Sequence, residues 1–144
     1  MGARKTKWYE HDPIRLAVEK KAMERRYPQF KLLKLSDGRL AWVGTLTSNT
    51  EERYKICVRY PYDFPNSPPK VFPIDPAIEV VDAGGRRLMH QWSDGHLCLY
   101  YPADRTFGSN STAATVVTVA AAWFFAYESW LRSGKLEWPG IEAD

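Results

Sequence analysis

The sequence predicts an α+β domain with an N-terminal helix, a four-stranded antiparallel meander, a cysteine-bearing loop and a long C-terminal helix packed on the sheet. Three observations lead to this prediction. A helical spacing of apolar residues begins after Asp12, and an alanine-rich, aromatic-rich segment spans residues 112–132. Between them lie four β-like stretches, whose connections are too short for crossover helices, so the strands are antiparallel.

Length and composition indicate one domain, residues 1–144, because a chain of 144 residues can bury one core but not two of ordinary size. Lys and Arg number 20 against 17 Asp and Glu, a formal charge of +3, which is too small an excess to indicate nucleic-acid binding without a recognition motif. No stretch has the pattern of a signal peptide or a membrane span, so we expect a cytoplasmic protein that binds no membrane. Its two cysteines, Cys57 and Cys98, are then expected to be reduced thiols.

The first helix is predicted from Asp12 to Arg26, because Asp12-Pro13 is typical of a helix start and Tyr27-Pro28 of a helix end. The repeat that defines it consists of Ile14, Ala17, Val18, Ala22 and Arg25. The opposite face, with Arg15, Glu19, Lys20, Lys21 and Arg26, is interpreted as solvated.

The strands are predicted at residues 30–35, 40–47, 53–60 and 70–74, with hairpin-type turns at 36–39 and 48–51. In the third strand strict alternation places Tyr54, Ile56, Val58 and Tyr60 on one face. Cys57 falls on the other face and is interpreted as structural.

The segment from residue 75 to 97 is irregular, and long loops of this kind are usually functional. The main helix follows at residues 112–132 and ends at Ser133-Gly134. In the tail, Trp138 is expected to dock on the rest of the domain.

Residues 60–71, Tyr-Pro-Tyr-Asp-Phe-Pro-Asn-Ser-Pro-Pro-Lys-Val, resemble the strand-to-loop signature of the ubiquitin-conjugating enzymes. Their prolines fix an extended path with few amide donors, which makes a rigid strap beside a sheet. A proline-rich recognition segment is the alternative for such a stretch.

A second motif, Gly95-His96-Leu97-Cys98-Leu99, is similar to the family's sequence around its active-site cysteine. His90 stands where the family has the histidine of His-Pro-Asn, but Gln91 and Trp92 follow it, so the Pro-Asn is missing. The order of elements also agrees with the family's fold from about residue 12 to 132. The departures resemble stand-alone bacterial members from CBASS-type antiviral operons.

This resemblance implies an enzyme that forms a thioester between Cys98 and the C-terminus of a ubiquitin-like protein or a cGAS-like nucleotidyltransferase and passes it to an amine. Some such relatives act beside a ubiquitin-activating-like enzyme and others without one. No cofactor or metal is implied.

The residues themselves allow this chemistry. In an extended Leu97-Cys98-Leu99 segment the leucines point inward and Cys98 outward, with His96 on the same side. A nearby imidazole lowers a cysteine pKa, and His90 and His96 are the candidates, either as oxyanion donors or as loop support. Asp94 and Asp104 are candidates for orienting an incoming amine.

A basic stretch of the first helix matches in position the helix with which the family docks on its activating enzyme. We expect a partner surface there and on the strap, composed of Arg15, Lys20, Lys21, Arg25, Arg26, Tyr62 and Phe64.

Three other readings stay open. The missing Pro-Asn favours an inactive binding module for a ubiquitin-like partner, whereas Cys98 favours an enzyme. A Cys-His hydrolase needs a third orienting group, which the sequence does not reveal. A zinc site from His90, His96, Cys98 and Cys57 lacks the spacing of structural zinc sites.

Overall fold

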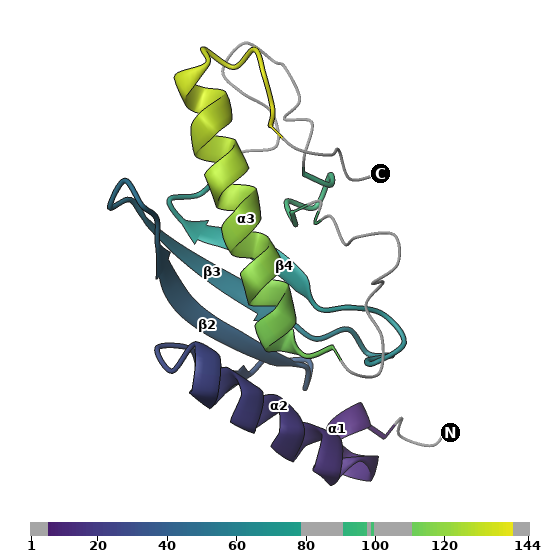
Figure 1. The fold of residues 1–144 in the computed structure, drawn as a ribbon. Helices are drawn as coiled ribbons and strands as arrows, with labels where there is room; N and C mark the ends of the chain where they lie inside the picture. The colour runs from purple at the N-terminus through teal and green to yellow at the C-terminus, as the bar shows by residue number, and fades with distance from the viewer. Residues whose placement is uncertain (1–5, 79–90, 98, 100–110, 140–144) are drawn as a thin grey trace.

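The structure is a computed structural model that describes residues 6–78, 91–97, 99 and 111–139. Its elements follow in chain order as α1 (Trp8–His11), α2 (Pro13–Arg26), β1 (Lys31–Lys34), β2 (Leu40–Thr47), β3 (Arg53–Arg59), β4 (Lys70–Asp75) and α3 (Ala113–Arg132). The strands form one antiparallel sheet in the order β1-β2-β3-β4, and α3 lies across one face of it (Figure 1). This arrangement confirms the predicted α+β class and agrees with a ubiquitin-conjugating-like fold.

The sheet forms where alternation and turn chemistry predict it. The turn between β1 and β2 is closed by the bond from the amide of Leu35 to the carbonyl of Arg39 at 2.8 Å, and Gly38 has a φ of 88° that favours glycine. In β3 the side chains of Tyr54, Ile56 and Val58 are buried, as the period of two requires. The predicted core face of this strand is therefore confirmed.

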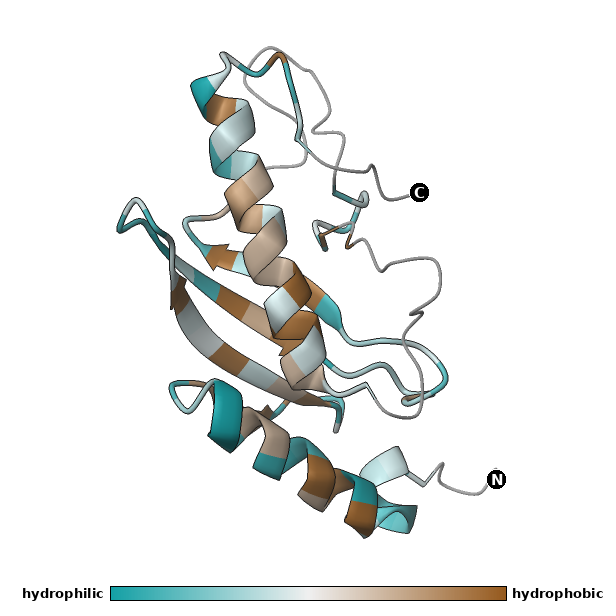
Figure 2. Cartoon of the chain, viewed as in Figure 1, coloured by the Kyte–Doolittle hydropathy of each residue, from teal (hydrophilic) through white to brown (hydrophobic). Residues whose placement is uncertain are grey.

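The core lies between this face of the sheet and α3. The inward side of α3 carries Val116, Val117, Ala120, Trp123 and Phe124, all buried. Figure 2 shows that most of α3 is apolar or intermediate in hydropathy, in contrast to the more hydrophilic α2. By length and composition alone, α3 is long and apolar enough to cross a membrane. Its buried residues, however, pack in the core of this domain.

Aromatic contacts fix α3 in place. Phe124 stacks on Tyr54 of β3 with ring centroids 4.3 Å apart, and Trp138 packs edge-on against Trp123 at 5.3 Å. The expected docking of Trp138 is thus confirmed.

The orientation of α2 differs from the prediction. Ile14 and Val18, assigned to the repeating apolar face, are 77% and 48% exposed, whereas Glu19, assigned to the solvated face, is fully buried with Met23. Burial of Glu19 is possible because donors from two other segments, Tyr60 and Ala113, and the guanidinium of Arg15 on α2 itself meet its carboxylate. The apolar residues that remain outside form an exposed stripe on α2.

The short helix α1 was not predicted. Its Trp8 is buried and packs against Tyr60 and Phe64, with centroid distances of 5.0 and 4.7 Å. Four residues are too few for a detectable helical period, so only the tertiary contact of Trp8 reveals this turn.

Candidate functional site

The residues before Cys98 form a tight hairpin, residues 91–97, which we call the cysteine hairpin. Gln91 and Leu97 pair as an antiparallel bridge, and the amide of Trp92 donates to the carbonyl of His96 at 2.9 Å. Gly95 turns the chain with a φ of 95°. The amide of Leu97 then donates to the carbonyl of Val71 at 2.9 Å, which attaches the hairpin to β4 one residue before Cys98.

Gln91 holds this hairpin from inside. Its side chain is 1% exposed, and Nε2 donates to the carbonyls of Gly95 at 2.9 Å and Ile78 at 3.1 Å. One amide therefore ties both arms of the hairpin to the segment after β4. Sequence reasoning missed this role because nothing in an irregular polar stretch distinguishes a buried glutamine from a solvated one.

His96 and Asp94, predicted as separate candidates, form a pair. Asp94 Oδ1 contacts His96 Nδ1 and also accepts the backbone amide of His96 at 3.1 Å. The imidazole stacks on Trp92 with an interplanar angle of 13° and lies 5.9 Å from the ring of Phe72. The ring is therefore held in position on two sides.

Charge and burial oppose each other at this pair. The pKa of His96 is lowered from its ordinary value, mainly because the ring is buried. The bond to Asp94 acts to raise this pKa, whereas the cations of Lys70 and Arg59 lower it further. For Asp94, burial acts to raise the pKa, but hydrogen bonds from His96 and the nearby Lys70 bring it below its usual value. The amine of Lys70 lies 3.8 Å from Asp94 Oδ2.

A groove of about 400 Å³, the cysteine groove, runs between the hairpin and the proline strap of residues 60–69. Asp63 accepts the Ser67 hydroxyl at 2.7 Å and thereby holds the strap wall. The lining residues are Pro61, Asp63, Ser67, Pro68, Pro69, Lys70, Val71, Trp92, His96, Leu97 and Leu99. Both chain neighbours of Cys98 thus line this groove.

Three predicted site residues, Cys98, His90 and Asp104, lie outside the described residues. The other cysteine, Cys57, is half-buried on β3, and burial raises the pKa of its thiol despite the opposing charge of Arg59. Within the described ranges no group of three or more His, Cys, Asp or Glu side chains could hold a metal ion.

The predicted partner surface divides into exposed and internal residues. Lys20, Lys21 and Arg25 are exposed on α2, and Lys21 and Arg25 share the face of the apolar stripe of Ile14 and Val18. Arg26 is also exposed and donates to the Thr118 hydroxyl of α3 at 2.8 Å.

Tyr62 is 58% exposed, and its ring lies under the cations of Lys7 and Arg39 at 5.1 and 4.7 Å. Phe64, by contrast, is 2% exposed inside the core, so it supports the strap and is not a surface residue. Its ring is buried because Trp8 and Tyr60 pack on it.

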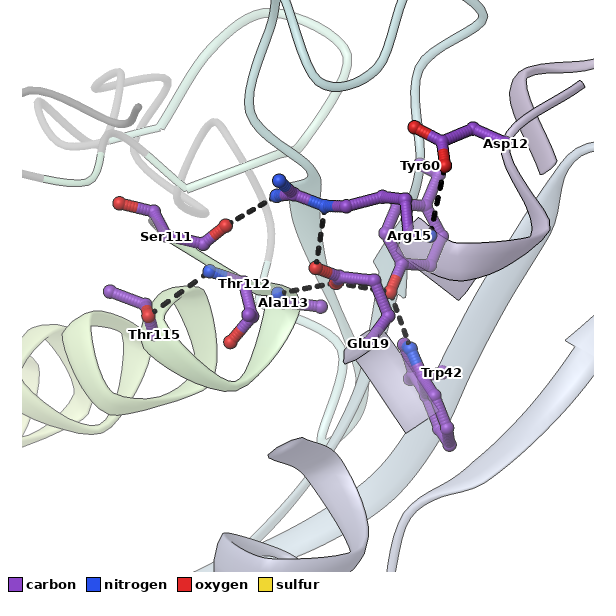
Figure 3. Close-up of polar contacts among 9 residues, drawn as sticks. All are labelled: Asp12, Arg15, Glu19, Trp42, Tyr60, Ser111, Thr112, Ala113 and Thr115. Atoms are coloured by element: carbon purple, nitrogen blue, oxygen red, sulfur yellow. Dashed lines mark hydrogen bonds and ion pairs between the residues drawn. The ribbon is translucent and has the colours of Figure 1, made fainter. Parts of the chain in front are cut away.

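Arg15 belongs to a buried polar network rather than to the surface (Figure 3). Its Nε lies 3.2 Å from Glu19 Oε2, and its Nη2 donates to the carbonyl of Ser111. Glu19 Oε1 accepts the Tyr60 hydroxyl at 2.7 Å and the amide of Ala113, at the start of α3, at 2.8 Å. Burial raises the pKa of Glu19 even though these bonds oppose the shift.

This network joins α2 to the start of α3 and to the residues directly before it. The carbonyl of Ser111 and the amide of Ala113 are both bonded to side chains of α2. The expectation that Glu19 is solvated is therefore wrong, because its charge and its hydrogen bonds are used inside the molecule.

No curated protein and no solved structure matches this chain significantly. A family model described as "Type II CBASS E2 protein" matches residues 19–144. The matched range includes the sheet, α3, and the strap and cysteine hairpin that line the groove. Because the match covers most of the chain, the protein belongs to the Type II CBASS E2 family.

Proposed function

We propose that this protein is a ubiquitin-conjugating-type acyltransferase of bacterial antiphage defence that carries its cargo as a thioester on Cys98. The cargo is the C-terminus of a ubiquitin-like protein or of a cGAS-like nucleotidyltransferase, and the acceptor is an amine. The reaction takes place in the cytoplasm, without a metal or cofactor held by this chain.

The observation that carries the proposal is the position of the cysteine hairpin. It is bonded to β4 through Leu97 and braced by Gln91, and the residues on both sides of Cys98 line one groove. A rigid support of this kind suits a nucleophile, because a reacting atom must be held close to its productive geometry. The family membership supports the same chemistry.

The chemistry has two steps. In the first, the Cys98 thiolate attacks the activated C-terminal carbonyl of the cargo, a C–S bond forms and the activating group leaves. In the second, an amine attacks the thioester, a C–N bond forms and Cys98 leaves as thiolate. A ubiquitin-activating-like enzyme supplies the activated carbonyl where the operon encodes one.

The exposed face of α2 is the docking surface that we assign to that activating partner. Lys21 and Arg25 share a helical face with the exposed apolar residues Ile14 and Val18, and Lys20 is also exposed on α2. A mixed apolar and basic surface suits a partner patch that is apolar at its centre and acidic at its rim.

Intact mass spectrometry under non-reducing conditions tests the proposal. The protein is incubated with its candidate cargo, ATP and the operon's activating enzyme, as wild type, Cys98→Ser and Cys98→Ala. We expect a hydroxylamine-labile adduct on the wild type, a hydroxylamine-resistant ester on Cys98→Ser and no adduct on Cys98→Ala. Cys57→Ser is the matched control and is expected to load as the wild type does, because Cys57 is half-buried on β3 and burial raises the pKa of its thiol, which makes it a poor nucleophile.

An absence of adduct with a verified cargo and activating enzyme would argue for the alternative, a catalytically inactive module that only binds a ubiquitin-like partner. Cargo binding that persists unchanged in Cys98→Ala, without any adduct on the wild type, would support that alternative.

A further inference from the structure

The cysteine groove contains a histidine whose two ring nitrogens differ in their surroundings. His96 Nδ1 contacts Asp94 Oδ1, and within the described residues the hydrogen bond and ion pair of the ring both run through this nitrogen. A carboxylate that accepts from Nδ1 fixes the neutral tautomer with its proton on Nδ1 and leaves a lone pair on Nε2. The ring thus has the form that a general base needs.

The position of the ring is equally constrained. Trp92 stacks on it with centroids 5.7 Å apart, and the Asp94 carboxylate also accepts the backbone amide of His96, so ring and backbone share one anchor. His96 lines the cysteine groove together with Leu97 and Leu99, which flank Cys98. A molecule bound in this groove therefore meets the imidazole and both chain neighbours of Cys98.

We propose that His96 is the general base of the transfer step and that Asp94 is its positioning residue. This inference rests on the proposed function, because it assigns the proton transfer for the amine that attacks the Cys98 thioester. The substrate class is a primary amine delivered along the cysteine groove.

The electron and proton balance of the step is as follows. The amine lone pair attacks the thioester carbonyl, and a C–N bond forms in a tetrahedral intermediate. Nε2 of His96 takes the proton from the attacking nitrogen, the C–S bond breaks and sulfur leaves as the Cys98 thiolate. The imidazolium then protonates that thiolate, so thioester and amine become amide and thiol, and His96 is neutral again.

The charges that face His96 keep it in the basic form at neutral pH. Its pKa is below the ordinary value because the ring is buried and because Lys70 of β4 and Arg59 of β3 are nearby, while Asp94 acts in the opposite direction. Asp63 of the strap lines the same groove. Base catalysis is accordingly expected to be lost only in acid, as the pH falls through this lowered pKa.

A cargo-independent assay tests the inference. The Cys57→Ser protein is loaded by exchange with a short peptide whose C-terminal glycine is a mercaptoethanesulfonate thioester. After removal of the donor, glycinamide is added, and mass spectrometry follows the loss of acyl-enzyme across a pH series. At each pH the rate of acyl-enzyme loss in the Cys57→Ser protein is divided by the rate in the same protein that also carries His96→Asn. Because both proteins react with the same glycinamide, the titration of glycinamide cancels in this rate ratio.

Asparagine is chosen because its amide can still donate to Asp94, so the anchor remains while the base is removed. We expect a rate ratio of about a hundred at neutral pH, the size typical of general-base catalysis, and a fall toward one in acid. Melting temperature and the extent of loading are expected to stay unchanged. Ser93→Ala, at an exposed site directly before Asp94, is the matched control with a ratio near one.

Two further variants separate a catalytic role from a structural one. Asp94→Asn removes a negative charge that favours the imidazolium, so the pH at which the rate ratio falls halfway should shift to a lower value. Lys70→Met removes a positive charge that disfavours the imidazolium, so that pH should shift to a higher value. Opposite shifts support His96 as the titrating base.

Normal loading with discharge rates that His96→Asn leaves unchanged at every pH would overturn this inference and leave the thioester proposal standing. A large rate loss whose pH midpoint does not respond to Asp94→Asn and Lys70→Met would also overturn it, in favour of loop support. Failure of the Cys57→Ser protein to load from the peptide thioester, together with failure to load its protein cargo, would overturn both.

Discussion

The Tyr60 hydroxyl donates to Glu19 Oε1 at 2.7 Å in the interior of the domain. The same hydroxyl accepts the indole N–H of Trp42 at 2.8 Å, and the same carboxylate oxygen accepts the first amide of α3. One carboxylate thus connects α2, the start of the strap and the start of α3 (Figure 3). Four predictions follow from this network, from the cysteine hairpin and from the surface of α2.

Replacement of Glu19 is expected to depend strongly on the substitute. Glu19→Ala leaves the Tyr60 hydroxyl and the amide of Ala113 without their acceptor and Arg15 without its counter-charge, so we expect a loss of about 3 kcal/mol in the free energy of unfolding. Glu19→Gln keeps an oxygen acceptor and removes a buried charge, so its cost is about 1 kcal/mol or less. Urea unfolding measures both; equal costs for the two variants would contradict the network as described.

The pH dependence of stability gives an independent check on Glu19. Its pKa is raised in the folded protein, so the native state holds a proton that the unfolded chain releases near the ordinary value. The stabilisation from this site is therefore complete below the unfolded pKa and is lost as pH rises through the folded pKa.

The measurement is the difference in unfolding free energy between wild type and Glu19→Gln across that pH range. We expect the wild type to lose stability relative to Glu19→Gln as pH rises. A difference that is constant with pH, or one of opposite slope, would show that Glu19 does not titrate as described.

Gln91 is expected to be essential for the cysteine hairpin. Gln91→Ala removes two buried hydrogen bonds and should cost about 2 kcal/mol, with faster hydrogen exchange at the Leu97 amide. Gln91→Glu has nearly the same shape but directs a carboxylate at two carbonyls, so at neutral pH it should be at least as damaging, and acid should partly restore it. Slow exchange at Leu97 in both variants would argue against Gln91 as the support; Ser93→Ala is the control.

The exposed face of α2 is expected to set the rate of partner docking. Exchanging Lys21 and Arg25 for glutamate should slow the loading of Cys98 by the activating enzyme about tenfold, and the effect should weaken with added salt. Loading is followed by non-reducing gel shift. Lys55→Glu on β3 introduces the same kind of charge reversal elsewhere and should not slow loading; an equal effect of both changes would indicate a general charge effect.

Much of the fold was predictable from local pattern. The predicted residues 40–47 coincide with β2, and the other strands and both long helices agree within one or two residues, because alternation, short turns and helix-start residues act over a few neighbours. The buried face of β3 follows from the same rule.

The face of α2 was not predictable in this way. Ile14 and Val18 have the side chains that normally face a core, yet they are exposed, while Glu19 is buried. A carboxylate can be buried only where donors meet it, and here the donors come from Tyr60, Ala113 and Arg15. No single segment contains that information.

The sequence by itself determined the order and type of the four strands and the two long helices, the strap and the motif around Cys98, because prolines, glycines and alternating side chains restrict the local backbone. Only the tertiary structure decided that Asp94 and His96 act as a pair, that Gln91 braces the hairpin, and that Phe64 is internal. The physical reason is that these contacts form only once the chain has folded: the bond of Leu97 to β4 holds the hairpin in which Asp94 meets His96, and Gln91 and Phe64 are buried by contacts with other segments.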